Sequence, residues 1–374
     1  MNQPSAAMDH RLWRRLPEDC LDRIIARLPL PSIFRLRSVS KRWNSFIFSE
    51  AFLALQSEVT CRCPCFLLCT QGRVACIYSF SLDRWHFVPL PKVRLTITTP
   101  PVSVVCAAGS FLLYGNQVSE CSVLFVCNPF TRQMRELPAM SRVRLIHKAT
   151  LIPDPIDRSY KIMVAGEDFL HLTSPHVYKL FTEVYDSASD CWKMAQDPLP
   201  DAKFGSDPGV WFGGSFFSIT ELPYGVVAFD LRSSSWRELK AAMPACLGSP
   251  SLVECKGRLM MVGRICHVKA ETGPKTESIR IWELQNAQTE WVELHRMPAN
   301  LCYEFVELLS PHSPFICVGM DNLICLTTHL SPRMLVFDAS THCWRWLPRD
   351  PLFPKHRNFH LLGFSFEPKL DAQP

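Results

Sequence analysis

A group of closely spaced cysteines contains the first side chains along the chain that could bind a metal. The group consists of Cys61, Cys63, Cys65 and Cys69. Structural zinc sites usually place two cysteines two to four residues apart on a turn, with a second pair far along the chain. Here Pro64 interrupts the group, and residues 66–68 continue it as an apolar strand. We therefore expect free, mostly buried thiols, and no metal.

Catalytic motifs are missing from the sequence. It contains no GxSxG nucleophile motif, no HExxH zinc motif, no phosphate-binding Walker A loop and no pair of carboxylates at a spacing suited to acid–base catalysis. Histidines such as His171 and His360 are scattered, and an isolated histidine is more often structural than catalytic. We expect a protein that is not an enzyme and needs no cofactor.

Two charged segments are candidates for binding a partner. The first spans residues 141–148 and the second is a long predicted loop from His267 to Ser278. The first could contact acidic groups or DNA phosphates, or be a strand on which basic and apolar residues alternate between solvent and interior. The second could be a recognition loop or a solvated hairpin. The candidate partner-binding residues are Arg142, Arg144, Lys148, Lys269 and Lys275.

The first 50 residues contain a pattern of short helices that would position any binding surface there. Leu21, Ile25 and Leu28 recur at the spacing of one helix face. Pro17 suits the start of this helix, and Pro29 suits its end. Ser40 is a predicted N-cap for a third helix. About 36 residues cannot bury enough apolar surface to be stable alone. The module must dock on the rest of the chain or complete its core with another protein.

These helices resemble the F-box. Two Leu-Pro pairs, at 16–17 and 28–29, precede Arg37-Ser38-Val39-Ser40-Lys41-Arg42-Trp43, which follows the family pattern R-x-V-C/S-K-x-W. The resemblance implies binding to a small Skp-type adaptor, which in turn binds a cullin scaffold. Some of the matching residues must instead form the module's own core, and the sequence does not separate the two sets. The residues implied in adaptor binding are Leu16, Pro17, Leu21, Ile25, Leu28, Pro29, Leu36, Val39 and Trp43.

The rest of the chain contains an internal repeat of about 50 residues. Each unit has an apolar strand ending in a polar residue, then a turn, then a large residue, and most units continue into a proline. An Asp or Asn side chain at the strand end can close the turn through the backbone, and a Trp offers a wide face for packing on a neighbouring sheet. The large residues are Trp85, Met134, Trp192, Trp236, Trp291 and Trp344.

The period and this signature resemble the kelch repeat, in which each unit is one four-stranded blade of a β-propeller. The family's double glycine is missing, so the repeat is degenerate. The first unit lacks its first strand, and we expect Leu361–Phe366 to supply it and close the ring. The predicted fold is a small all-α F-box followed by an all-β six-bladed kelch-like β-propeller closed by a C-terminal strand. A seven-bladed or incomplete ring is the alternative.

Longer stretches are similar to the plant F-box/kelch-repeat proteins of the Unusual Floral Organs type, among them Ser249–Leu259 and the segment from Ile281 to Pro298. That resemblance implies a substrate receptor of an SCF-type (Skp–cullin–F-box) E3 ubiquitin ligase, in which the propeller holds the protein to be ubiquitylated. The alternative is a non-proteolytic scaffold or transcription cofactor that bridges a DNA-binding partner. The substrate is unknown and could be a transcription factor.

Composition fits this organisation. The 374 residues include 47% apolar residues, 17 cysteines and a net charge of +5. The odd cysteine count and the absence of a signal sequence predict a reducing compartment, here the nucleus and cytoplasm. We expect no membrane segment. The net charge is less positive than that of a dedicated nucleic-acid-binding protein, so direct contact with nucleic acid is possible but not expected. The predicted domains are a flexible N-terminus at 1–12, the F-box at 13–48, a linker helix at 49–63, the propeller at 64–368 and a tail at 369–374.

Overall fold

The computed structural model contains two compact units. The first consists of Met1–Cys63 with Pro368–Asp371, and the second of Pro64–Glu367 with Ala372–Pro374. The structure describes residues 15–59, 64–70, 74–88, 90–91, 102–115, 123–143, 145–154, 156–168, 180–195, 203–221, 223–267, 276–309, 315–328, 331, 333–351 and 361–374. The predicted flexible N-terminus at 1–12 lies outside these residues.

The first unit is helical. Pro17 and Pro29 directly precede its first two helices, where a proline ring fixes φ and no amide N–H is needed. The Ser40 hydroxyl accepts a hydrogen bond from the Trp43 amide at 3.2 Å, which confirms the predicted N-cap. Ser49 caps the next helix in the same way. The helices are α2 (Glu18–Ala26), α3 (Leu30–Leu36), α4 (Lys41–Phe46) and α5 (Glu50–Ser57).

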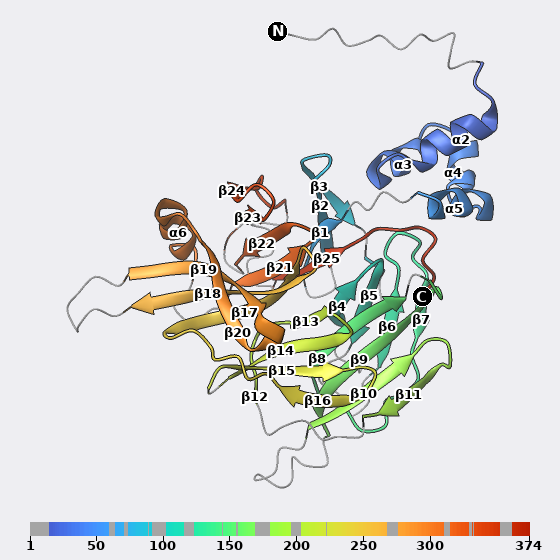
Figure 1. Ribbon diagram of the computed structural model, residues 1–374. Helices are drawn as coiled ribbons and strands as arrows, with labels where there is room; N and C mark the ends of the chain where they lie inside the picture. Colours follow the sequence, from blue (N-terminus) through green and yellow to red (C-terminus); the bar gives the residue numbers. More distant parts are fainter. Residues whose placement is uncertain are drawn as a thin grey trace, which may run out of the picture. The chain divides into compact units, whose positions relative to one another are not determined.

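The second unit is a six-bladed β-propeller, as predicted (Figure 1). The first three blades have these strands, from the innermost outward. Blade 1 contains β25 (Leu361–Phe366), β1 (Cys65–Thr70), β2 (Val74–Ser79) and β3 (Arg84–Val88). Blade 2 contains β4 (Ser103–Ala108), β5 (Phe111–Gly115), β6 (Leu124–Cys127) and β7 (Met134–Glu136). Blade 3 contains β8 (Leu145–Asp154), β9 (Ser159–Glu167), β10 (Leu180–Asp186) and β11 (Cys191–Met194).

The other three blades follow in chain order. Blade 4 contains β12 (Lys203–Phe204), β13 (Val210–Phe212), β14 (Ser215–Glu221), β15 (Gly225–Asp230) and β16 (Ser235–Glu238). Blade 5 contains β17 (Leu247–Cys255), β18 (Arg258–His267), β19 (Thr276–Gln285) and β20 (Glu290–Arg296), with the short helix η2 (Asn286–Gln288) before its last strand. Helix α6 (Ala299–Val306) precedes blade 6, which contains β21 (Ile316–Met320), β22 (Leu323–Thr327), β23 (Leu335–Asp338) and β24 (Cys343–Trp346).

The two ends of the propeller sequence close the ring within blade 1. Strand β25 pairs antiparallel with β1, so that Leu361 lies opposite Thr70 and Phe366 opposite Cys65. Figure 1 shows the red-orange β25 beside the blue β1. The predicted closing strand is therefore confirmed. Inner strands also touch in sequence around the ring, from β25 to β4, β8, β13, β17, β21 and back to β25.

Blade 4 departs from the four-strand pattern. Both β12 and β13 pair with β14, because the inner strand is interrupted between Phe204 and Val210. Residues 205–209 leave the sheet at this point and form a small loop. Gly209 has a φ of +76°, and a Cβ there would lie 2.3 Å from the Phe216 ring, so only glycine fits. No feature of the repeat pattern predicted this interruption.

At two junctions between blades, a hydrogen bond links the repeated Trp to the repeated Leu-Pro segment. The Trp192 indole N–H of blade 3 donates to the Pro138 carbonyl after blade 2 at 2.8 Å. The Trp85 indole of blade 1 donates to the Pro348 carbonyl after blade 6 at 3.0 Å. In both places the Trp of one unit binds the Leu-Pro segment of the unit before it. At these two junctions the two sequence landmarks form one inter-blade contact, whereas the Trp236 indole of blade 4 donates to the Thr182 hydroxyl of blade 3 at 2.9 Å.

An arginine that directly follows the large residue of blades 2, 4 and 6 makes a second inter-blade contact. Each reaches the turn before the outer strand of the next blade. Arg135 lies 3.0 Å from Asp190 and Arg345 lies 3.3 Å from Asp83, and both aspartates also accept a hydrogen bond from a tyrosine hydroxyl. These contacts join blades 2–3, 4–5 and 6–1 through Arg135–Asp190, Arg237–Gln288 and Arg345–Asp83.

Apolar side chains of adjacent blades fill the spaces between the sheets. Between blades 6 and 1, for example, Phe66 and Tyr78 pack with Met320 and Val336, and Trp85 packs against this group. This placement confirms that the repeated Trp packs between blades. In the described part of the chain, no helix is both long and apolar enough to cross a membrane.

The strand-end carboxylates close the predicted turns. The Asp230 carboxylate accepts the Ser233 amide at 2.8 Å, and Asp338 accepts the Ser340 amide at 2.7 Å. Asn128 makes the same contact with the Phe130 amide at 3.1 Å. The bond from the Ser233 amide holds the pKa of Asp230 below its ordinary value. Because the folded state favours the carboxylate, this group stabilises the fold above pH of about 4 and loses that contribution as the pH falls further.

Asp230→Ala is expected to lower the free energy of unfolding by about 0.5–1.5 kcal/mol at pH 7. Asp230→Asn keeps an oxygen acceptor, as Asn128 does in blade 2, and should cost less. Denaturant midpoints at pH 7 and pH 3 check this. The difference between wild type and Asp230→Asn should shrink at pH 3, and a difference that grows at acid pH would contradict the assigned role of the charge.

Candidate functional site

The helical unit has a small interior formed by residues from all parts of the module. Its fully buried side chains include Ile33, Ile47 and Phe52. The Gln56 side chain of α5 donates to the Ala26 carbonyl at the end of α2 at 2.7 Å. Helix α5 therefore packs on α2 and belongs to the same structural unit. Among residues 15–59, the other buried apolar residues are Ile25, Ala26 and Leu30.

Arg42 connects α4 to α2. Its guanidinium lies 3.3 Å from both the Glu18 and the Asp22 carboxylates and 4.7 Å from the centre of the Trp43 ring. Burial raises the pKa of Asp22, and the positive charge of Arg42 opposes that rise. These two acidic groups of α2 thereby hold α4, the helix that contains Trp43, in place.

The nine side chains implied in adaptor binding do not share one environment. Ile25 is only 5% exposed and belongs to the module's own interior. Pro17 is exposed, and Val39 is 71% exposed although it is apolar. The remaining six are half-buried, and they are Leu16, Leu21, Leu28, Pro29, Leu36 and Trp43. The structure thus separates a core residue from surface residues where the sequence could not.

Phe48 is a surface residue of the module that the sequence pattern did not single out. It is 37% exposed, and the Arg37 guanidinium lies 4.9 Å from the centre of its ring. Arg37 in turn donates to the Asn44 side chain at 3.0 Å, and Phe34 lies 6.2 Å from Phe48 between ring centres. Arginine and aromatic side chains often carry much of the binding energy at protein interfaces. The only sequence signal was a phenylalanine just after a helix.

Arg142 lies where blade 3 begins and is held by several contacts. Its guanidinium is 3.7 Å from the Asp168 carboxylate and 5.4 Å from the centre of the Phe181 ring. The buried Glu183 carboxylate accepts the backbone amides of residues 141, 142 and 143 at 2.8, 2.7 and 2.9 Å. The Arg142 side chain remains 53% exposed. It is a fixed, accessible cation, as a partner-binding residue requires.

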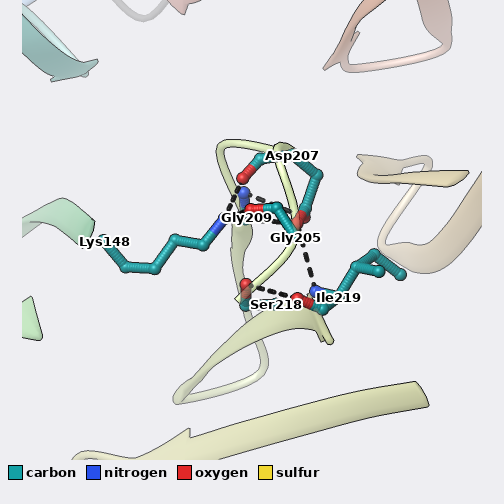
Figure 2. Close-up of polar contacts among 6 residues, drawn as sticks. All are labelled: Lys148, Gly205, Asp207, Gly209, Ser218 and Ile219. Carbon is teal, nitrogen blue, oxygen red and sulfur yellow. Dashed lines mark hydrogen bonds and ion pairs between the residues drawn. The ribbon is translucent and has the colours of Figure 1, made fainter. Parts of the chain in front are cut away.

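Lys148 was predicted as a partner-binding residue, and the structure contradicts this. Lys148 is 4% exposed, and its ammonium group lies 3.3 Å from the Asp207 carboxylate of blade 4 (Figure 2). The ammonium also donates to the carbonyls of Gly205, at 2.9 Å, and Asp207. A lysine whose donors are all taken inside the propeller cannot offer its charge to a partner.

The Asp207 carboxylate completes this buried network. It accepts the Ile219 amide at 3.2 Å and the Gly209 amide at 3.1 Å (Figure 2). Burial raises the pKa of Asp207, whereas the Lys148 charge and the two amides oppose that rise. The ion pair joins β8 of blade 3 to the loop that interrupts the inner strand of blade 4. Its role is structural, and the sequence gave no sign of it because the partners lie 59 residues apart.

The other predicted site residues lie outside the described part of the chain. They are Arg144, Lys269 and Lys275. The same holds for Cys61, Cys63, His171 and His360, which were considered above as metal-binding or catalytic residues. Cys65 and Cys69 are buried in β1. Within the described residues, no three or more His, Cys, Asp or Glu side chains are grouped so that they could hold a metal ion.

Comparison with protein families identifies both units. A family model described as the F-box domain matches residues 13–55. A second, described as the KIB1-4 beta-propeller, matches residues 77–303, which is more than half of the chain. The propeller family is therefore the KIB1-4 type, whereas the sequence pattern suggested a degenerate kelch repeat.

Curated plant proteins are similar along nearly the whole chain. "Protein UNUSUAL FLORAL ORGANS" of Arabidopsis thaliana is 30% identical over 364 residues, covering 92% of this chain and 80% of that protein. "F-box only protein 6" of the same plant is 28% identical, covering 93% and 72%. "Protein ABERRANT PANICLE ORGANIZATION 1" of Oryza sativa subsp. indica is 28% identical, covering 97% and 90%. Each of these alignments covers more than 90% of this chain and therefore spans both of its units.

Proposed function

The chain is an F-box protein with a KIB1-4 β-propeller, and from this membership we propose that it is the substrate-recognition subunit of an SCF-type E3 ubiquitin ligase. F-box proteins generally connect a substrate to the ligase and are not themselves catalytic. In this proposal the helical unit binds a Skp-type adaptor attached to a cullin scaffold. The propeller binds the protein to be ubiquitylated.

The observation that carries the proposal is the apolar surface of the helical unit. Few side chains of residues 15–59 are fully buried, yet Val39 is 71% and Ile24 is 38% exposed. Covering such side chains with a partner removes apolar area from water and contributes about 25 cal/mol per Å². An adaptor that covers them would therefore supply the part of the core that this small module lacks.

The propeller suits a receptor that must hold a partner in a fixed place. Its ring is closed by strand pairing, and its blades are joined by indole and guanidinium contacts at the outer strands. Transfer of ubiquitin needs the substrate lysine close to the bound donor, so the subunit would contribute proximity. We propose Arg142 as one substrate contact, because its guanidinium is both fixed and accessible.

The proposal includes a protein substrate, with a transcription factor as the candidate class, and action in the nucleus and cytoplasm. Bridging of a DNA-binding partner without its degradation is the competing role. It would use the same propeller surface but would not lower the amount of the partner.

Substrate capture with an adaptor-deficient variant tests the proposal. Leu16→Ala combined with Pro17→Ala should release the adaptor and retain substrates on the propeller. Proteins captured by this variant are then measured in cells expressing the wild-type chain, with and without proteasome inhibition. Accumulation of a captured protein under inhibition, and its ubiquitylation only with the wild-type chain, supports the ligase role. Captured proteins whose amounts respond to neither the inhibitor nor the variant would contradict it.

A further inference from the structure

Two cysteines lie directly opposite each other at the end of blade 5. Leu247 of β17 pairs with Ile265 of β18, and one residue further the Cys266 amide donates to the Cys246 carbonyl at 3.2 Å. Residues that face each other in this way on antiparallel strands have Cα atoms about 5.5 Å apart. Disulfides span Cα separations of about 4.4–6.8 Å, so the backbone spacing of this pair is suitable.

The pair is also accessible. Cys246 is exposed and Cys266 is half-buried, and neither is in a disulfide. Most other described cysteines lie inside the propeller, where burial raises the pKa of thiols such as Cys69, Cys127 and Cys255 to about 12. Such thiols stay protonated and unreactive, because the thiolate is the nucleophile. An oxidant from solution therefore meets Cys246 before it meets the interior thiols.

Cys246 lies in the turn directly before β17, outside the regular ladder. Cys246 has a φ of +58° and Ser249 a φ of +50°, both in the left-handed region that non-glycine residues seldom adopt. The pairing of β17 with β18 is irregular between Gly248 and Ser251. Opposed Cβ atoms are about 4.5–5.5 Å apart, and a disulfide needs about 3.5–4.5 Å. Because Cys246 lies in a turn and not within the ladder, a movement of about 1 Å in this turn closes the difference.

We propose that Cys246 and Cys266 form a reversible disulfide, which makes the end of blade 5 a redox modification site. With a glutathione disulfide as oxidant, the Cys246 thiolate attacks one of its sulfurs, forming a mixed disulfide and releasing one glutathione. The Cys266 thiolate then attacks the Cys246 sulfur and releases the second glutathione. The protein dithiol is oxidised by two electrons, and the two thiol protons end on the two glutathione molecules.

This inference stands apart from the ligase proposal, because it needs neither an adaptor nor a substrate. Its chemistry agrees with the reducing compartment expected from the sequence, where protein disulfides are usually transient and redox-sensing. Cys343 provides a matched control. It is also exposed, but the residue opposite it on β23 is Asp338 and not a cysteine.

Peptide mapping of the natively folded full chain tests the site. The chain is equilibrated in buffers of defined reduced and oxidised glutathione, remaining thiols are alkylated, and linked peptides are identified by mass spectrometry. We expect a Cys246–Cys266 link that forms with increasing oxidised glutathione and is lost on reduction. In Cys266→Ser, Cys246 should instead keep a bound glutathione, and Cys343→Ser should leave the link unchanged.

Three results would overturn the proposal. The first is wild-type Cys246 that carries glutathione without any link, which would mean that Cys266 cannot reach it. The second is reaction of Cys343 with glutathione while neither Cys246 nor Cys266 reacts, which would mean that Cys246 is not accessible. The third is a disulfide between Cys246 and a different cysteine. Because each result is read from the folded wild-type chain, a destabilised variant cannot produce it.

Discussion

Val39→Asp is expected to weaken binding of a Skp-type adaptor by at least about 30-fold. Val39 is 71% exposed, so the substitution leaves the interior of the helical unit untouched. In a complex that covers Val39, the new carboxylate would be buried without a partner, and losses of about 2 kcal/mol or more are typical of interface hot spots. Isothermal titration calorimetry with purified full-length chain and adaptor measures the change.

Ile156→Asp is the matched control for this experiment. Ile156 is 89% exposed on the turn between β8 and β9 of the propeller. The same change of an exposed apolar side chain should leave adaptor affinity and stability within about 0.5 kcal/mol of wild type. Equal affinities of Val39→Asp and wild type would show that the adaptor does not cover this side of the module.

Lys148→Met should lower the free energy of unfolding of the propeller by about 3–5 kcal/mol, because it leaves the Asp207 carboxylate buried without its countercharge. The midpoint of thermal unfolding should fall by about 10 °C. Because the destabilisation comes from the unpaired Asp207 carboxylate, the double variant Lys148→Met with Asp207→Asn should regain part of the lost free energy of unfolding. Guanidinium or thermal unfolding of the full chain gives these values.

Lys161→Met is the control for the buried pair. Lys161 also lies in blade 3 and is 3.5 Å from Asp186, but its side chain is 44% exposed. Exposed ion pairs contribute about 0–1 kcal/mol, so this variant should differ little from wild type. If Lys148→Met were no more destabilising than Lys161→Met, the Lys148–Asp207 pair would not join blades 3 and 4 as described.

The repeat architecture could be predicted because it depends on local chemistry repeated along the chain. A polar residue at a strand end closes a turn wherever it occurs, and Asp230 and Asp338 do so as expected. The closing strand was predictable because the first unit lacked a strand and Leu361–Phe366 was left unpaired. The turns needed only a few neighbouring residues, and the closing strand followed from counting the strands of each repeat unit.

Contacts between distant residues could not be predicted in the same way. Lys148 looked like a surface residue because it follows other basic residues, whereas its environment is set by Asp207 on the next blade. The interruption of the inner strand of blade 4 has the same origin. In the helical unit, the residues that match the F-box motif include both the buried Ile25 and the exposed Val39. The spacing of apolar residues along the sequence does not distinguish a side chain buried within the chain from one exposed on the surface of the helical unit.

The most direct test of the account is the heat capacity of adaptor binding, measured by titrating the purified full chain with a Skp-type adaptor at several temperatures. If exposed apolar side chains of the helical unit complete their core with the adaptor, binding should be one to one, with a dissociation constant below about 1 µM and a clearly negative heat-capacity change. No binding at about 100 µM, or binding without that change in heat capacity, would contradict the shared core on which the receptor function depends.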